Sequence, residues 1–372
     1  MNNFYWYLPS EVFFGSEAIN NLKTKASAFG KKALLVTGKR FARESGLKDR
    51  VESLLTEAKI DVVTFSEARE DPDTETVAEG AKSCRQERCD FIIGAGGGSA
   101  LDTAKGIAIL TTNPGGAGDY FGTDKVFCAP LPIIAIPTTA GSGSEVTRYA
   151  VIIDPKAKTK KTISSGGIIP RLALIQPSLT LSLSNFLTAS TGLDALSHAV
   201  EGALTKKITP LTLAIAKEAV QIITKTLPIA VDTPDNLECR EKMSLAAMMA
   251  GMVINQTGTI IGHGMGYPLT INYRVQHGTA GSLVLPAIFG FLLKKGYREQ
   301  IREVTGWDEP VSTWRDFCRR VGLPISLKEV GVKENELPQL AKEALSACQR
   351  SMENLGIILT EPDFHEIYRV SF

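Results

Sequence analysis

Four residues of this chain have the types and spacing of a metal site: Asp194, His198, His263 and His277. The whole chain contains four histidines, and three of them belong to this set. Asp194 and His198 are four residues apart in the proline-free stretch TGLDALSHAVEG, so a helix would place both side chains on one face. One carboxylate and three imidazoles suit a divalent transition metal such as iron or zinc.

The alternative reading is an acid and a histidine that merely pair on a helix. Four apolar residues surround this pair: Ala195, Leu196, Ala199 and Val200. Asp194 is therefore expected to be buried, and a buried charge needs a partner or a metal. His263 and His277 lie in a stretch whose glycines and Pro268 predict irregular structure. His365 stands among charged residues and is left out of the set.

The elements that must position these side chains change in character near residue 180. Before that point, apolar or β-branched runs at 31–38, 61–65, 90–98, 131–139 and 172–176 alternate with helical stretches. This alternation predicts βαβ units and a parallel sheet buried on both faces. Afterwards, 211–227 and 239–254 have helical spacing. We expect a Rossmann-like α/β domain over 1–181 and an all-helical, metal-binding domain over 182–372.

A glycine-rich turn follows the third of these runs. Gly96, Gly97, Gly98 and Ser99 stand between an apolar strand and a helical stretch, SALDTAKGIAIL. Glycines allow close approach of the backbone, and a helix N-terminus offers free N–H groups to a phosphate. Such turns also occur for packing reasons, so phosphate binding and packing both remain open here. The turn is not a Walker A loop, because no Gly-Lys-Ser/Thr follows.

A second polar cluster ends the next run. The segment 136–145, IPTTAGSGSE, carries Thr138, Thr139 and Ser142. These hydroxyls could line the same crevice beyond the carboxyl ends of the strands, where open α/β sheets bind ligands. A simple polar turn is the alternative.

Composition narrows the class of protein. The net charge is +1 and no apolar run approaches the roughly 20 residues of a membrane span, so we expect no nucleic-acid or membrane partner. The N-terminus lacks the pattern of a signal peptide. The six cysteines show no C-x-x-C spacing and are expected to be reduced, buried thiols in a cytoplasmic protein.

Together these features resemble the iron-containing (group III) alcohol dehydrogenases, which have a dehydroquinate-synthase-like fold. The resemblance spans nearly the whole chain. It rests on GGGSALDTAK (96–105), IPTTAGSGSEVT (136–147), STGLDALSHAVEG (190–202) and the GHGMGYP…HG segment (262–278). All four metal-ligand positions carry the residue types of that family.

The resemblance implies roles for further residues. Gly97, Gly98 and Ser99 would bind the pyrophosphate of a nicotinamide cofactor, and Thr138 and Thr139 would hold the cofactor beside the metal. Other positions that match cofactor contacts are Gly96, Asp102, Ser142, Thr147, Tyr149, Lys160 (or Lys161) and Leu179. The metal would act as a Lewis acid on the substrate oxygen while hydride passes to or from the nicotinamide.

Two positions depart from the common family pattern. Tyr267 stands where many members have a second histidine that is discussed as a proton relay, so we place it among the catalytic candidates. The first strand ends in Gly38, Lys39 and Arg40 where NAD-using members usually carry an acid, and Asp71 replaces an asparagine before proline. Without the acid nothing repels a 2′-phosphate, which predicts a preference for NADP(H) over NAD(H).

The expected substrates are small primary alcohols, diols and their aldehydes, and Fe²⁺ is the expected metal, replaceable by Zn²⁺. Three alternatives were weighed: a metal-free relative of the maleylacetate reductase kind, a zinc-dependent polyol dehydrogenase of the glycerol type, and a non-catalytic metal-binding protein. The aromatic opening segment FYWYLPSEVFFG reads as a strand that needs a partner edge, and the family commonly dimerises there, so we expect a homodimer.

Overall fold

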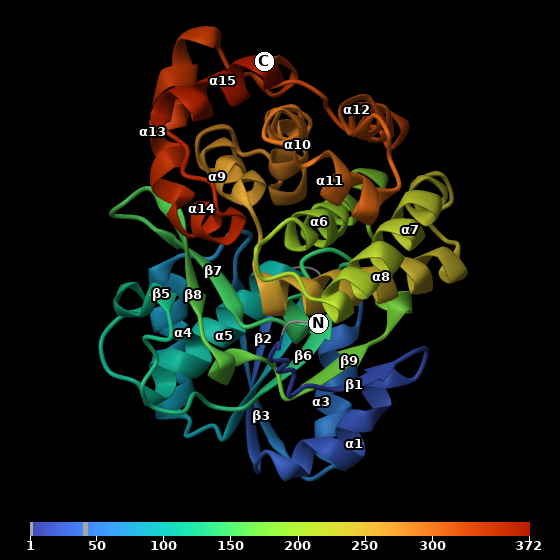
Figure 1. The fold of residues 1–372 in the computed structure, drawn as a ribbon. Coiled ribbons are helices and arrows are strands. Elements are labelled where there is room, and N and C mark those ends of the chain that lie inside the picture. Colours follow the sequence, from blue (N-terminus) through green and yellow to red (C-terminus); the bar gives the residue numbers. More distant parts are fainter. Residues whose placement is uncertain (1–2, 40–43) are drawn as a thin grey trace. The chain divides into compact units, whose positions relative to one another are not determined.

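The N-terminal half is built around a parallel six-stranded sheet. The computed structural model describes residues 3–39 and 44–372 (Figure 1). All pairings in this sheet are parallel, and the strand order is β1-β9-β6-β4-β2-β3. The strands are β1 (Glu11–Phe14), β2 (Lys32–Gly38), β3 (Asp61–Ala68), β4 (Phe91–Gly96), β6 (Ile133–Pro137) and β9 (Leu172–Ile175). Four of the five predicted apolar runs contain one of these strands, and the run 61–65 covers the first five residues of β3.

Both faces of the sheet are buried. Alternate side chains of a central strand point into two apolar clusters, one on each face of the sheet. On β2, Ala33 and Leu35 belong to one apolar cluster, and Leu34 and Val36 belong to the other. The first cluster includes residues of α1 (Leu22–Lys25) and α3 (Leu47–Glu57), and the second includes residues of α4 (Thr74–Gln86) and α5 (Gly98–Thr112). A continuous apolar strand is thus stable only between two helical layers.

A small second sheet accompanies the main one. Its strands are β5 (Gly122–Thr123), β7 (Tyr149–Asp154) and β8 (Thr159–Ser164), in the order β5-β8-β7. The β7–β8 pair is antiparallel. This hairpin carries Tyr149 and Lys160, two of the predicted cofactor residues.

The remainder of the chain is helical, as predicted (yellow-green to red in Figure 1). The helices are α6 (Asn185–Ala203), α7 (Pro210–Asp232), α8 (Leu237–Thr257), α9 (Ile261–Tyr273), α10 (His277–Lys294), α11 (Arg298–Thr305), α12 (Pro310–Arg320), α13 (Leu337–Ala347), α14 (Gln349–Leu355) and α15 (Glu361–Ser371). α6 packs against α7, α8 and α10. Ser184, Thr209 and Asn236 cap the N-termini of α6, α7 and α8 with their side chains.

The stretch around His263 corrects one expectation from the sequence. Its glycines and Pro268 predicted irregular structure, but α9 runs through Gly262, Gly264, Gly266 and Pro268 and ends at Tyr273. The glycines serve close packing instead, since a Cβ at Gly264 would lie 2.4 Å from the Cys348 Sγ. The chain turns only at Arg274, whose φ is +56°. Tertiary packing here outweighs the low helix propensity of glycine and proline.

By length and composition alone, helix α10 could pass for a membrane span, although the sequence predicts no membrane partner. However, 72% of its 18-residue apolar window is buried inside the protein. Its side chains fill the core of the helical half, with Leu285, Ile288 and Phe289 fully buried. The apolarity of this helix is accounted for by its place in that core.

The chain divides into two compact units, and each unit is made of more than one segment of the chain. The sheet-containing unit comprises Leu8–Thr139 and Ser144–Thr180. The helical unit comprises Leu181–Phe372, the segment Ala140–Gly143 and the N-terminal segment that ends at Tyr7. Within the helical unit, the backbone carbonyl of Tyr7 accepts a hydrogen bond from the Asn255 side chain at 3.0 Å.

All six cysteines are free thiols and all lie in the described part of the chain. Five are buried as expected, but Cys128 is exposed. Its neighbours explain the difference, because the loop after Asp124 has few residues that pack and Phe127 is itself 69% exposed.

Candidate metal and cofactor sites

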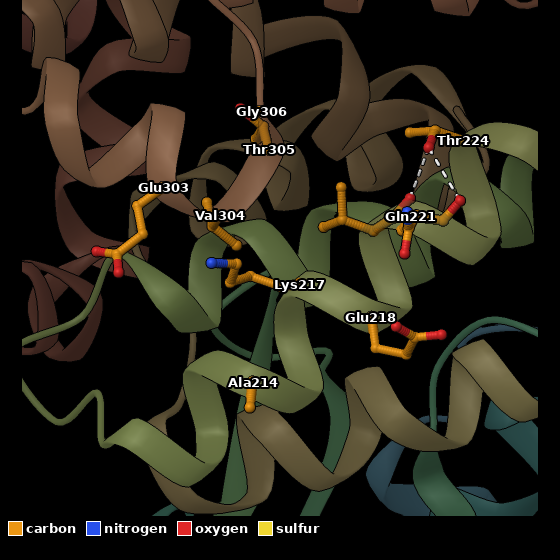
Figure 2. A pocket seen from close by; sticks show the side chains of 10 residues that line it. Ala214, Lys217, Glu218, Gln221, Thr224, Glu303, Val304, Thr305 and Gly306 are labelled. Carbon is orange, nitrogen blue, oxygen red and sulfur yellow. Dashed lines mark hydrogen bonds between the residues drawn. The ribbon is translucent and has the colours of Figure 1, made fainter.

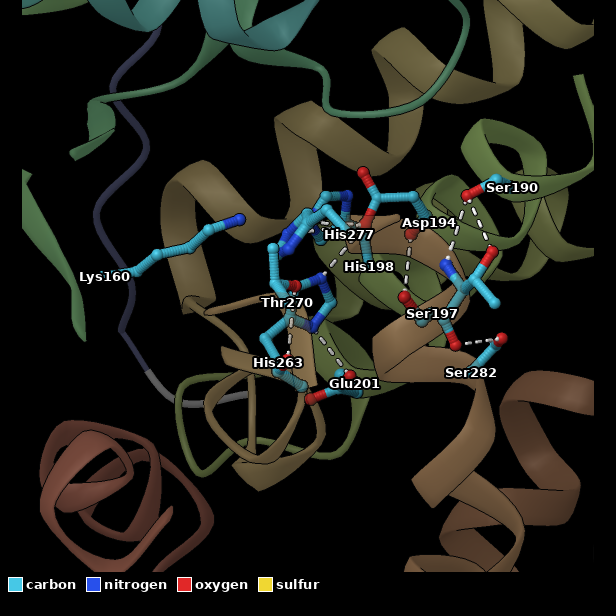
Figure 3. Close-up of polar contacts among 12 residues, drawn as sticks. Lys160, Ser190, Asp194, Ser197, His198, Glu201, His263, Thr270, His277 and Ser282 are labelled. Atoms are coloured by element: carbon cyan, nitrogen blue, oxygen red, sulfur yellow. Dashed lines mark hydrogen bonds and ion pairs between the residues drawn. The ribbon is translucent and has the colours of Figure 1, made fainter. Parts of the chain in front are cut away.

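Three helices bring the four predicted metal ligands together (Figure 3). Asp194 and His198 lie one turn apart on α6, His263 lies in the first turn of α9, and His277 is the first residue of α10. The Oδ1 atom of Asp194 lies 3.9 Å from the Nε2 of His198, 3.5 Å from that of His263 and 3.8 Å from that of His277. The Asp194, His263 and His277 ligand atoms all lie within 4.8 Å of one another, and His198 Nε2 lies at the edge of this group, 3.9 Å from Asp194 Oδ1.

Ring packing holds these imidazoles in place. The rings of His198 and His263 stack with centroids 4.4 Å apart, and His277 meets His263 edge-on at 5.6 Å. Asp194, His198 and His263 are buried, whereas His277 is about a third exposed. The site is thus closed on the side of α6 and α9 and accessible beside His277.

The donor set fits a divalent metal. The Nε2 atom of His263 is buried, and among the described residues it has no hydrogen-bond partner. Such an orphaned nitrogen is costly unless something binds it. Asp194, His263 and His277 offer ligand atoms within 4.8 Å of one another, and neutral imidazole with carboxylate is a common donor set for iron and zinc.

The pKa values of the ligand side chains are shifted in different directions. Burial lowers the pKa of His198 to about 4, although the Asp194 carboxylate opposes this shift. Burial also disfavours protonation of His263, but the carboxylates of Glu201 and Asp194 outweigh it and raise its pKa to about 10. Burial alone would raise the pKa of Asp194, but the surrounding histidines hold it below its usual range.

A glycine is required where α10 starts against α6. A Cβ on Gly278 would lie 2.0 Å from the carbonyl oxygen of Ser190 and 2.9 Å from the Asp194 Cβ. The Ser190 hydroxyl also accepts a hydrogen bond from the Thr279 N–H at 3.2 Å. These contacts fix the start of α10, and so the position of His277, relative to Asp194.

Tyr267 lies one helical turn beyond His263 on α9. Its ring stacks near that of His277, with centroids 5.9 Å apart and 30° between planes. The structure thus brings this candidate to the ligand cluster. Two further polar residues of the cluster were not singled out from the sequence: Ser190 and Glu201.

The predicted cofactor residues gather at the carboxyl edge of the main sheet. Strands β2, β4 and β6 end there in register, which aligns Gly38, the turn Gly96–Ser99 and Thr138. The Thr138 N–H donates to the Gly96 carbonyl at 2.9 Å. The Thr139 side chain lies against Gly97, where an added Cβ would be 3.2 Å from its Cγ2.

Asp71, Ser99 and Lys160 form one polar group at this edge. The Asp71 N–H donates to the Ser99 Oγ at 3.2 Å, and the Lys160 Nζ lies 2.6 Å from the Asp71 Oδ1. Asp71 has a φ of +53°, which an aspartate tolerates better than most residues. Lys161 pairs instead with Asp154 at 2.8 Å, so Lys160 is the lysine that joins this group.

Asp102 forms hydrogen bonds that connect neighbouring segments of the protein. Its Oδ1 accepts from the Ser144 hydroxyl at 2.7 Å, and its Oδ2 accepts from the Val151 N–H at 2.9 Å. Its carboxylate therefore ties α5 to the segment after β6 and to β7. Burial raises the pKa of this carboxyl, although Lys105 opposes the shift.

Lys105 forms hydrogen bonds to the same segments as Asp102. It was not predicted from the sequence. Its Nζ is fully buried and donates to the Ser144 hydroxyl, to the Thr147 carbonyl and hydroxyl, and to the Tyr149 carbonyl at 2.7 to 3.2 Å. Burial lowers its pKa to about 8, and burial raises the pKa of the neighbouring Glu145 to about 7. Thr147 and Tyr149 are thus held by this lysine through their hydrogen bonds.

Three further predicted positions have surroundings of their own. Leu179 packs against the core cluster on the α1 and α3 face of the sheet. Ser142 belongs to the helical unit with the rest of Ala140–Gly143. Lys39 pairs with Glu67 at 2.6 Å, and Arg40 lies outside the described residues.

A hollow of about 650 Å³ lies on the helical unit between α7 and α11 (Figure 2). Its lining residues are Ala214, Lys217, Glu218, Val220, Gln221, Thr224 and Glu303–Gly306. None of them is a predicted site residue, and the charges are mixed in sign. We assign no role to this hollow.

Comparison with known proteins identifies the class. The family model "Iron-containing alcohol dehydrogenase" matches residues 9–177, and "Fe-containing alcohol dehydrogenase family, C-terminal" matches residues 188–371. The chain belongs to the iron-containing alcohol dehydrogenase family, and is therefore an oxidoreductase that uses a nicotinamide cofactor.

Individual relatives cover the whole chain. A 1,3-propanediol dehydrogenase of Citrobacter freundii is 35% identical over 99% of both chains. The NAD-dependent methanol dehydrogenase of Bacillus methanolicus is 34% identical over 96% of this chain and 97% of its own. The crystal structure of an iron-containing alcohol dehydrogenase from Thermotoga maritima is 36% identical, covers 99% of each chain and superposes with a TM-score of 0.88. The expected family and fold are confirmed.

Proposed function

We propose that this protein interconverts small primary alcohols or diols and their aldehydes, with one divalent metal per chain. The observation that carries the proposal is the convergence of Asp194 Oδ1 and three histidine Nε2 atoms at 3.5 to 3.9 Å. The proposed metal is Fe²⁺, replaceable by Zn²⁺. Relatives named as a methanol dehydrogenase and a 1,3-propanediol dehydrogenase support the substrate class.

The chemistry divides between the two segments expected from the sequence. Residues 182–372 would hold the metal, which as a Lewis acid stabilises negative charge on a substrate oxygen. Residues 1–181 would hold the nicotinamide, which exchanges the hydride. Gly98 and Ser99 begin α5 and offer backbone N–H groups to the pyrophosphate. The Tyr267 hydroxyl can both donate and accept a hydrogen bond, so we assign it the transfer of the substrate proton.

For the cofactor we propose a preference for NADP(H). Strand β2 ends at Gly38 and is followed by Lys39, without the acid that would bind the ribose hydroxyls of NAD. Lys39 is a candidate partner for a 2′-phosphate, but it already pairs with Glu67. The preference is therefore expected to be modest, which accords with a family whose relatives include an enzyme named as NAD-dependent.

The test is an assay of straight-chain alcohols, diols, glycerol and the matching aldehydes with NADH or NADPH. We expect turnover of small primary substrates, loss of activity after chelation, and recovery on addition of Fe²⁺ or Zn²⁺. Turnover confined to glycerol-type polyols with zinc would replace the proposal with the polyol dehydrogenase alternative. Binding of metal without binding of either cofactor would mean a non-catalytic protein.

We also propose a homodimer formed through the N-terminal strand. β1 covers only Glu11–Phe14, so it is shorter than the aromatic segment suggested. Among the described strands, it pairs with β9 alone. Its other edge can pair with a second copy, and Phe14 on it is 40% exposed. Sedimentation at micromolar concentration should give twice the chain mass of 40.1 kDa. A monomer under these conditions would contradict the proposal.

The free thiols support a cytoplasmic location. Five of the six cysteines are buried in the reduced form. Such usage is typical of a reducing compartment.

A further inference from the structure

A second buried carboxylate lies behind the metal ligands. Glu201 is on α6, seven residues after Asp194 and three after His198, so all three side chains share one helical face. Its side chain is fully buried. One oxygen, Oε1, lies 2.8 Å from the Nδ1 of His263, and the other, Oε2, accepts from the Gly262 N–H at 3.1 Å (Figure 3).

The first turn of α9 is shaped to receive this carboxylate. A Cβ on Gly262 would lie 2.5 Å from Oε1 and 2.9 Å from the carboxyl carbon of Glu201. Any side chain at position 262 would therefore push the carboxylate away from the imidazole. The backbone N–H of Gly262 is one of the groups at a helix start that need an acceptor, and Glu201 supplies it.

Burying the Glu201 carboxylate costs free energy unless a partner such as the His263 imidazole compensates for it. A buried carboxylate is unfavourable without a partner, and among the described residues the ion pairing of Glu201 is with His263. His263 in turn presents its Nε2 to Asp194 Oδ1 at 3.5 Å. A carboxylate that accepts from Nδ1–H leaves Nε2 as the electron-donating nitrogen and fixes the plane of the ring.

We propose that Glu201 is a positioning residue that sets the tautomer and orientation of His263 for metal binding. The proposal rests on the proposed metal-dependent function and adds a residue to it. It also gives the buried site a second negative charge, so that Asp194 and Glu201 together balance one dication with neutral imidazoles.

The test compares metal binding by the metal-free protein and its variants. Glu201→Gln keeps the volume but cannot accept from both His263 and Gly262, since its amide nitrogen is a donor. We expect the dissociation constant for Zn²⁺, measured by competition with a chromophoric chelator, to rise about 10- to 100-fold. The visible spectrum of the Co²⁺ form should also change in position or intensity. Thr205→Val, which removes a buried hydroxyl two residues after the end of the same helix, should change neither.

A readout at the ring itself separates positioning from general damage. The chain has four histidines, so ¹⁵N-histidine spectra of the zinc form contain few signals. We expect a protected Nδ1–H signal from His263 in the natural protein and its loss or shift in Glu201→Gln. Should that variant fail to fold, Gly262→Ala provides the second route, because it displaces the same carboxylate without removing it.

Two outcomes are decisive against the idea. Zinc affinity within threefold of the natural value in folded Glu201→Gln or Gly262→Ala would overturn the role of Glu201 alone. Failure of the natural protein to bind any divalent metal would overturn the proposed function together with it.

Discussion

Replacing His263 with alanine is expected to lower kcat by at least about a thousandfold, because a Lewis acid contributes several kcal/mol and each 1.36 kcal/mol is a factor of ten. The variant loses one imidazole of the cluster and leaves the buried Glu201 carboxylate without the His263 ring that it contacts. Metal content should fall well below one ion per chain. The fold should survive, since the helical core extends far beyond this site.

The measurement combines elemental analysis, turnover and thermal unfolding of the same preparations. His365→Ala is the matched control, because it removes the one histidine outside the cluster, on α15. That control should keep its metal and its activity. Full turnover of His263→Ala in the absence of metal would show that the proposed mechanism is wrong.

Replacing Gly38 with aspartate should reverse the cofactor preference. We expect the natural protein to favour NADPH by roughly 5- to 50-fold in kcat/KM, since an exposed, salt-screened charge contact is worth about 1 to 2 kcal/mol. The aspartate would repel the 2′-phosphate and bind the ribose hydroxyls of NADH. The backbone tolerates it, because a Cβ at Gly38 would meet only the Ala68 carbonyl, at 3.5 Å.

Glu67→Gln tests the same turn from the other side. It releases Lys39 from its ion pair, so the preference for NADPH should increase rather than decrease. Both variants are assayed with both cofactors at one ionic strength. A natural protein that prefers NADH, or a ratio that the aspartate leaves unchanged, would refute this reading of the turn.

The architecture could be predicted from the sequence because buried strands appear in it as runs of apolar residues. In the strand Lys32–Gly38, the residues Ala33–Val36 are consecutively apolar and buried, as expected of a strand between two helical layers. Asp194 and His198 were also accessible, since an acid and a histidine four residues apart in an apolar helix are unusual. The pair was predicted from its spacing together with its apolar neighbours, and the resemblance to the family completed the ligand set.

What the sequence hid depends on contacts between distant segments. Gly262, Gly264 and Gly278 look like helix breakers, but each makes room for a neighbouring chain segment. Lys105 and Glu201 look like ordinary charges of a helix surface. Only the fold shows that Lys105 holds the segment around Thr147 and that Glu201 reaches His263, 62 residues away in sequence. The signal for Glu201 was present, because it continues the helical face of Asp194 and His198.

The path of the chain bears on how this protein could be dissected or recombined. The chain passes between its two units after Tyr7, Thr139, Gly143 and Thr180. The four-residue segment Ala140–Gly143 is part of the helical unit, where Gly143 fits so closely that an added Cβ would lie 2.4 Å from the Gly251 Cα. A gene fragment that encodes only 182–372 would lack this segment and Tyr7. The two units are therefore not exchangeable modules, and a chimaera with a relative would have to inherit all three pieces of the helical unit from one parent.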